Sequence, residues 1–426
     1  MTAYLVNAII IGVLIYLIYK RYVPSDMRSC FFPALGLKLF AGVALGLLYC
    51  EYYGFGDTIA YHQDAIKLSN QALSNISGYI KMLLGRSHNI DVVGFTFYNQ
   101  PRAFFLVKIL STVHLLSGQN YWMSGLYFSL FSFMGFWMLA CTLVRYFPSI
   151  RLGVIISLLF FPSVVFWSSG IIKESIAMGA LVLLIHLLID WILSRQMNWK
   201  RIVSGLLLLA LVWHLKYYYL GVFLVTAIPL IFTDVIVKNK LLKINAYGIY
   251  GALFGAVVIL VSLLHPNFHL TDILYVIVEN HDIYVLKSQQ GQYIVYRDLA
   301  PTWWSIASNF PMALWSGLFR LGIWEANSML EYFVGFEKLV VLIFSISAIC
   351  RLGDIKKSSH KLLILTACFY TILLSGFLAM SAPNFGTLAR YSVGYMPILL
   401  LLILSNNPLL TFLKSKFVTK VEEIVE

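Results

Sequence analysis

Residues Phe31–Tyr53, FFPALGLKLFAGVALGLLYCEYY, form an apolar run that is long enough to cross a bilayer. The run leads directly into Gly54–Ala65, GFGDTIAYHQDA, which carries Asp57, His62 and Asp64 where the chain would leave the membrane. Carboxylates at a membrane boundary are costly to bury and useful for chemistry. We therefore interpret this loop as the functional centre and the rest of the chain as its support.

The composition predicts an all-α, polytopic membrane protein. Hydrophobic residues make up 60% of the 426 residues and charged residues only 12%, and the mean hydropathy is +0.81. A soluble chain of this length could not bury so much apolar surface. No cleavable signal peptide is evident, because the first residues lack a basic region and a small-residue cleavage site. The five cysteines have no CxxC spacing and suggest neither a metal site nor a disulfide framework.

Eleven apolar runs are near the length that a bilayer requires, and together they predict a single membrane domain over residues 1–426. These runs are Tyr4–Tyr19, Phe32–Cys50, Trp122–Val144, Gly153–Ser168, Ile176–Leu193, Ile202–Leu215, Tyr219–Val237, Ala246–Leu264, Phe333–Cys350, Leu362–Met380 and Val393–Leu404.

The distribution of charge predicts the orientation. Cytoplasmic loops of membrane proteins are rich in Lys and Arg, so the net charge of +12 indicates topology here rather than a nucleic-acid partner. If the first span starts outside, one side collects the basic residues Lys20, Arg21, Arg28, Arg145, Arg151, Arg195, Lys200, Arg201, Lys238, Lys240, Lys243, Arg351, Lys356, Lys357, Lys361, Lys414, Lys416 and Lys420. The other side collects most of the acids: Glu51, Asp57, Asp64, Asp91, Glu174, Asp272, Glu279, Asp282, Asp298 and Glu325.

Two outer segments, about 53–121 and 265–332, are too long to be simple connections and are rich in aromatic residues. We expect them to be extracytoplasmic and to carry interfacial helices. Ala103–Leu116 is apolar but short, and a further crossing there would move every later basic loop outside. We therefore expect it to lie on the outer face of the membrane or to be re-entrant.

Four short stretches hold the candidate site residues. In a helix that starts near Gly56, Asp57, Tyr61 and Asp64 would share one face at i, i+4 and i+7, next to His62. Gly54 and Gly56 would allow a tight exit from the membrane helix. The simpler alternative is that Asp57 only caps this helix.

The second stretch is Phe161–Ser175, FPSVVFWSSGIIKES, in which Pro162 and Gly170 predict a break and a turn before a new helix. The helix N-terminus together with Lys173 could hold a phosphate. The alternative is a hairpin whose Lys173 and Glu174 are only solvated.

The third stretch, Trp213–Tyr219, WHLKYYY, places His214 and Lys216 at an outer turn beside aromatic rings such as Tyr218. It could hold a sugar and a phosphate, or be an interfacial aromatic belt.

The last stretch is Ser381–Pro397, SAPNFGTLARYSVGYMP, where we expect Arg390 at a helix start on the outer face. A guanidinium there calls for an anionic partner, either a phosphate or an acidic side chain in a structural ion pair. Arg102 and Arg297 are further outer cations.

An outer-loop acid followed by a Tyr and a small helix resembles the GT-C superfamily of integral-membrane glycosyltransferases. The resemblance implies an enzyme that takes a sugar from a polyprenyl-phosphate carrier, with the loop acid as base or acceptor-orienting group. In this chain that position matches Asp57, with Asp64 as a second candidate, although here the acid follows the second predicted span instead of the first. The second and last stretches also resemble uncharacterised membrane proteins of bacterial surface-polysaccharide loci.

The resemblance, together with the predicted orientation, implies a transferase of the bacterial inner membrane, with its active site on the extracytoplasmic face, a polyprenyl-phosphate-linked donor and a glycan or lipid-linked acceptor. Catalysis is assigned to Asp57 and Asp64. The donor phosphate is assigned to Arg390, Lys173 and Lys216. Substrate contacts are assigned to Tyr61, His62, Arg102, Glu174, His214, Tyr218 and Arg297. Membrane lipids are further partners.

Three points stay open. A divalent cation, Mg²⁺ or Mn²⁺, could act with Asp57 and Asp64, although such ions take several oxygen ligands and the sequence indicates no complete set. A repeat-unit polymerase for O-antigen or capsule would use the same chemistry. A transporter or flippase for lipid-linked glycan would need charged groups within the spans, where Lys38, His186 and Asp190 are among the few.

Overall fold

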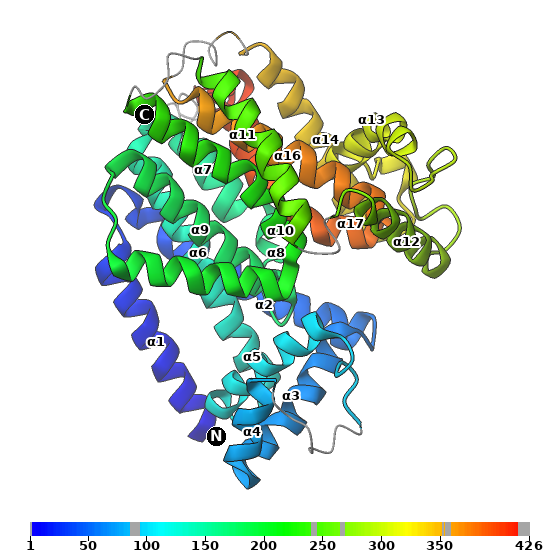
Figure 1. The fold of residues 1–426 in the computed structure, drawn as a ribbon. Coiled ribbons are helices and arrows are strands. Elements are labelled where there is room, and N and C mark those ends of the chain that lie inside the picture. The colour runs from blue at the N-terminus through cyan, green and yellow to red at the C-terminus, as the bar shows by residue number, and fades with distance from the viewer. Residues whose placement is uncertain are drawn as a thin grey trace. The chain divides into compact units, whose positions relative to one another are not determined.

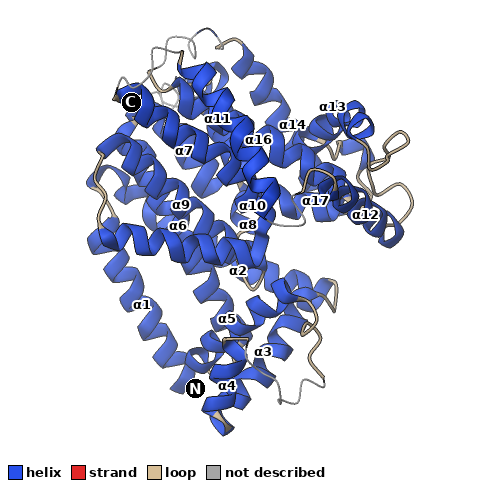
Figure 2. Cartoon of the chain, in the orientation of Figure 1, coloured by secondary structure: helices blue, strands red, loops and turns tan. Residues whose placement is uncertain are grey.

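The computed structural model describes residues 2–85, 94–239, 245–264, 269–351, 353 and 359–415. Parts of the predicted basic loops and of both outer segments lie outside the described residues. Helices dominate the described part, in which the only β-pairing is an isolated bridge between Tyr293 and Asn384 (Figure 2). The predicted all-α class is therefore confirmed for this part of the chain.

Contacts divide the chain into two units, which are described separately. Unit 1 comprises residues 1–146 and 158–220, and unit 2 comprises residues 147–157 and 221–426. The prediction of a single membrane domain stays a prediction.

The described residues of unit 1 form eight α-helices and the first part of a ninth, α10, which continues into unit 2 (Figure 1). These helices are α1 (Thr2–Tyr22), α2 (Arg28–Leu47), α3 (Asp57–Ser74), α4 (Ile76–Leu83), α5 (Pro101–Ser117), α6 (Tyr121–Tyr146), α8 (Pro162–Phe166) and α9 (Lys173–Ser194), followed by the first part of α10 (Trp199–Lys238). A π-helical turn, η2 (Leu48–Tyr52), ends α2.

Helices α6 and α9 pack closely because glycines face each other at their crossing. A Cβ atom added at Gly135 would lie 2.3 Å from the carbonyl oxygen of Gly179, and one added at Gly179 would lie 2.9 Å from the Cα of Ser132. Small residues that let helix backbones approach are typical of contacts between membrane helices. This pair forms the centre of unit 1.

The loop between α2 and α3 has the tight exit that its glycines predict. Gly54 and Gly56 both have positive φ angles, 67° and 137°, which residues with a Cβ rarely adopt. A side chain at Gly56 would also collide with the ring of Tyr49. The chain therefore turns out of η2 and starts α3 at Asp57, as the sequence predicts.

The described part of unit 2 contains two short helices that precede α8, the rest of α10 and the helices that follow α10. These are η3 (Pro148–Ile150), α7 (Arg151–Ile155), α11 (Ala246–Leu264), α12 (Asp272–Lys287), α13 (Trp303–Phe319), η6 (Ile323–Glu325), α14 (Met329–Ile349), α16 (Lys361–Ser381), α17 (Phe385–Tyr391), η7 (Ser392–Gly394) and α18 (Met396–Leu404), with the π-helical turn η4 (Ile156–Phe160) shared with unit 1. Helix α16 packs against α12, α13 and α18, and α14 also packs against α18.

Among the described residues, eight helices are long and apolar enough to cross a membrane, or nine if the bent pair Phe385–Gly394 and Met396–Leu404 is one span. Such helices are typical of a multi-pass membrane protein. The predicted spans Ile202–Leu215 and Tyr219–Val237 fall in the single helix α10, which is interrupted at Lys216. The predicted span Gly153–Ser168 is divided among α7, η4 and α8. The number eleven therefore stays a prediction.

Candidate functional site

A buried ion pair between Glu174 and Lys216 lies at the centre of the candidate site in unit 1. The Nζ atom of Lys216 is 2.6 Å from Oε1 of Glu174, and the two side chains are only 3% and 0% exposed. Both positions follow from local breaks in the helices. Gly170, with a φ of +69°, turns the chain so that α9 can begin at Lys173, and Lys216 interrupts α10 with a φ of −146° and a ψ of 65°. The burial of Glu174 argues against the alternative in which this glutamate is only solvated.

Aromatic side chains surround this ion pair, as the sequence of the third stretch suggests. Lys216 donates to the hydroxyl of Tyr218 at 3.0 Å and lies over the rings of Tyr218 and Tyr219, 5.5 and 5.8 Å from their centroids. Cations over aromatic faces are attracted by the ring quadrupole. The ammonium group is therefore held by one carboxylate and several rings.

Two further contacts join α5 to α10 beside the ion pair. The guanidinium of Arg102 lies 4.8 Å from the ring centroid of Tyr217, and the ring of Phe105 stacks on His214 at 4.7 Å. Arg102 and His214 are exposed, so this junction presents a cation, an imidazole and aromatic faces to its surroundings. Such faces can stack on sugar rings.

Tyr61 connects α3 to the start of α9. Its ring lies 5.8 Å from the Nζ atom of Lys173 and 4.5 Å from the ring of Phe97. Tyr61 also belongs to a buried cluster that includes Ile171 and Leu215, so α3, the turn before α9 and the break in α10 share one core. Of the predicted site residues, unit 1 thus links Tyr61, Lys173, Glu174, Lys216 and Tyr218, with Arg102 and His214 on the adjacent junction.

The two candidate catalytic carboxylates lie in different environments. Asp57 is exposed in the first turn of α3, one turn before Tyr61, where the helix dipole favours a negative charge. Asp64 is fully buried and accepts hydrogen bonds from the backbone N–H groups of Thr96 at 3.1 Å and Phe97 at 2.9 Å. Lys67 is 3.2 Å from the same carboxylate. Asp64 therefore anchors the chain before α5 onto α3, which the sequence did not reveal.

His62 forms a pair with His114 of α5. The Nδ1 atom of His62 is 3.2 Å from Nε2 of His114, and its ring packs against Tyr121 at 5.3 Å. Burial lowers the pKa of His62. Burial first, and then the neighbouring His62, lower the pKa of His114 to about 4. Both imidazoles are therefore neutral near pH 7, and one donates to the other across the contact between α3 and α5.

The remaining predicted cations belong to unit 2. Arg390 is half-buried in the last turn of α17, whereas the sequence suggested a helix start. The helix begins earlier because the side chain of Asn384 caps it by accepting a hydrogen bond from the N–H of Thr387. Arg297 is exposed, and its backbone N–H donates to Asn309 at 3.1 Å.

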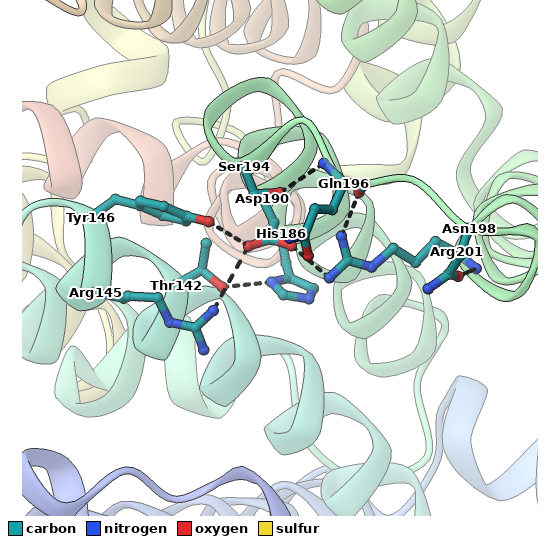
Figure 3. A network of polar contacts seen from close by, with 9 residues as sticks. All are labelled: Thr142, Arg145, Tyr146, His186, Asp190, Ser194, Gln196, Asn198 and Arg201. Carbon is teal, nitrogen blue, oxygen red and sulfur yellow. Dashed lines mark hydrogen bonds and ion pairs between the residues drawn. The ribbon is translucent and has the colours of Figure 1, made fainter.

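A polar network lies at the C-terminal end of α9. The sequence indicated His186 and Asp190 as charged groups within spans, but not that they belong to one network. Asp190 lies 2.7 Å from Arg201, accepts from the hydroxyl of Tyr146 at 2.8 Å and lies 3.8 Å from Arg145 (Figure 3). His186, one turn earlier, contacts Thr142 at 2.6 Å. The network joins α6, α9 and α10, and its hydrogen bonds between α6 and α9 connect residues 44 apart in sequence, so no local pattern marks it.

The charged groups within the spans have partners inside the protein. Lys38 donates to the hydroxyl of Ser168 and lies 4.8 Å from the ring centroid of Phe136, and His186 and Asp190 belong to the network above. Lys38, His186 and Asp190, the charged groups that a transporter would need within its spans, therefore have contacts with other side chains of the protein.

No group of three or more His, Cys, Asp or Glu is placed to hold a metal ion within the part of the chain that the structure describes. Asp64 directs its oxygens to protein donors. The divalent cation considered with Asp57 and Asp64 therefore has no ligand set among these residues, and no chemical step is assigned to it.

Comparisons with protein-family models, with curated proteins and with solved structures found no match to this chain.

Proposed function

We propose that the protein is a membrane glycosyltransferase of GT-C type, which moves a sugar from a polyprenyl-phosphate carrier to a glycan or lipid-linked acceptor on the extracytoplasmic face. The observation that supports the proposal best is the grouping in unit 1. Two lysines, a buried glutamate and several aromatic rings lie around the start of α9, and the exposed Asp57 begins the helix that packs against them.

In this proposal Asp57 takes the proton of the attacking acceptor hydroxyl, as a general base. The hydroxyl oxygen forms a bond to the anomeric carbon while the bond from that carbon to the carrier phosphate breaks, and the phosphate leaves with the electron pair. Lys173, at the N-terminus of α9, stabilises the charge that develops on the phosphate. Lys216, whose charge is balanced by Glu174, orients Tyr218 through its hydrogen bond.

The aromatic junction between α5 and α10 supplies stacking faces for the sugar in this proposal. The half-buried His62 lines the approach to Asp57 on α3, while the buried Tyr61 holds α3 against Lys173. Glu174 keeps Lys216 in place, and His214 and Arg102 contact the sugar or its phosphate. Arg390 and Arg297 remain proposed ligands of donor and acceptor on the basis of the sequence alone.

The proposal is tested with a labelled polyprenyl-phosphate sugar and membranes that contain the full chain. We expect Asp57→Asn to lower the transfer rate by roughly 10²–10⁴-fold, the usual effect of removing a general base. Glu51→Gln is the matched control, since Glu51 is an exposed acid in the same loop region, and it should transfer sugar normally.

Full transfer by Asp57→Asn at normal expression would remove the assignment of the base. The enzymatic proposal as a whole would be wrong if purified protein moved the labelled carrier across vesicles and transferred no sugar. Product length separates a transferase, which adds one unit, from a repeat-unit polymerase, which makes a ladder.

A further inference from the structure

Helix α13 of unit 2 has a reversed burial pattern. Its buried positions are small or polar: Ser305, Asn309, Ala313, Ser316 and Gly317. Its exposed side is apolar except for Ser308, and carries Trp304, Ala307, Pro311, Met312 and Trp315 at helical spacing. A helix on the surface of a soluble domain shows the opposite arrangement. The pattern therefore requires an apolar environment outside the protein.

Two polar side chains on the inward side of α13, Ser305 and Asn309, are hydrogen-bonded within the protein. The amide of Asn309 donates to the carbonyl oxygens of Arg297 and Ser305 at 2.9 and 3.0 Å and accepts from the N–H of Arg297. The hydroxyl of Ser305 accepts from the N–H of Ala300 at 2.9 Å. The helix is thus fixed to the preceding loop by hydrogen bonds.

Close packing attaches α13 to the membrane-length helix α16. A Cβ atom at Gly317 would lie 2.7 Å from the carbonyl oxygen of Ser375, and one at Gly376 would lie 2.4 Å from the ring of Phe310. The inner side of α13 is therefore filled, and the apolar side points away from α16.

The apolar side is large and aromatic. Trp304 is 83% exposed, Trp315 is 55% exposed and Met312 is 42% exposed. Exposed apolar side chains continue on α14, a helix of membrane length, at Phe333, Phe336, Ile343 and Ile346. The same environment that covers these side chains of α14 can cover those of α13.

We infer that α13 is immersed in the bilayer, with Trp304, Met312 and Trp315 among lipid acyl chains, although it is not one of the helices long enough to cross. Tryptophan suits this position because its ring is apolar and its N–H can reach the headgroup level. Acyl chains fit the surface better than a second copy of the chain, because α13 contacts α14, a helix of membrane length that also carries exposed apolar side chains. The inference does not depend on the proposed enzymatic activity.

Spin labels measure the environment of α13 directly. The full chain, with its five cysteines replaced by serine or alanine, is reconstituted in bilayer nanodiscs with a single label at Met312→Cys or Trp304→Cys. Accessibility to oxygen, which concentrates in lipid, is compared with accessibility to a water-soluble nickel chelate. Ile346→Cys on α14 is the lipid reference and Gln290→Cys, in an exposed loop of the same unit, is the water reference.

We expect the ratio of oxygen to nickel accessibility at Met312 and Trp304 to match that at Ile346 and to be severalfold higher than at Gln290. A ratio equal to that at Gln290 would place α13 in water and overturn the inference. Low accessibility to both reagents would place the helix against protein and would overturn it as well. A second label site guards against local disturbance by either substitution.

Discussion

At the scale of single residues, the ion pair between Glu174 and Lys216 differs from the other described pairs because both partners are buried. A buried pair stabilises a protein little compared with apolar residues of the same shape, yet losing one partner leaves an uncompensated charge. We expect Lys216→Met or Glu174→Gln alone to cost about 3–5 kcal/mol of stability, and the double variant to cost less than the sum.

Thermal unfolding in detergent measures this prediction. Lys238→Met is the matched control on the same helix, since Lys238 is half-exposed and pairs with Asp234 at i, i+4. Such a pair contributes only about 0.3–0.5 kcal/mol. Equal losses for Lys216→Met and Lys238→Met, or strictly additive losses for the two site variants, would show that the ion pair is not buried as described.

Several of these residues could be predicted from sequence, but their partners could not. Lys216 stands out because a lysine lies between apolar helices and three tyrosines, and Gly54, Gly56 and Gly170 mark the turns that the structure confirms. The pairing of Lys216 with Glu174, and of Asp64 with the backbone of Thr96 and Phe97, joins residues that are distant in the chain. Such contacts depend on how helices pack, which local patterns do not encode.

At the scale of helices, the crossing of α6 and α9 depends on two glycines that have no space for a side chain. We expect Gly135→Ala to destabilise unit 1, because the new methyl group would meet the carbonyl oxygen of Gly179 and overpacking costs about 1–3 kcal/mol. Gly125→Ala on the same helix is the control, since its Cβ would lie 3.8 Å from the nearest atom.

The two variants gain the same helix propensity, about 1 kcal/mol, so only packing separates them. A lower midpoint of thermal unfolding for Gly135→Ala, with an unchanged or higher midpoint for Gly125→Ala, would agree with the close crossing. Equal midpoints would mean that α6 and α9 are farther apart.

At the scale of the whole molecule, two ion pairs fix the direction of helices within unit 1. Glu174 and Asp190 lie 16 residues apart on α9 (190 − 174), and their partners Lys216 and Arg201 lie 15 apart on α10 (216 − 201). The two helices are therefore antiparallel over about 24 Å, at 1.5 Å per residue. This length approaches the thickness of the hydrocarbon core, which is the spacing expected for pairs near its two boundaries.

The helix directions agree with the alternating directions of successive spans that the basic loops predict. Tyr4 at the start of α1 contacts Asn120 before α6 at 2.6 Å, while Tyr22 at its end accepts from Trp137 at 3.1 Å, so α1 and α6 are parallel. Arg145 and Asp190 lie near the C-terminal ends of α6 and α9, which makes these two parallel as well. Assignment of one end to the cytoplasm rests on the charge rule.

Single cysteines test that assignment in intact cells. With the native cysteines replaced, we expect Phe55→Cys, in the exposed loop before α3, to react with a membrane-impermeant maleimide added outside. Gln196→Cys, exposed between α9 and α10 beside Asp190 and Arg201, should react only after permeabilisation. The charge rule predicts this order because Arg195, Lys200 and Arg201 surround Gln196. The opposite order would mean that the protein has the inverted topology, with Asp57 and Lys173 on the cytoplasmic side. Both a carrier-linked donor and a nucleotide sugar would have access to that side. The proposed extracytoplasmic transfer would then be wrong.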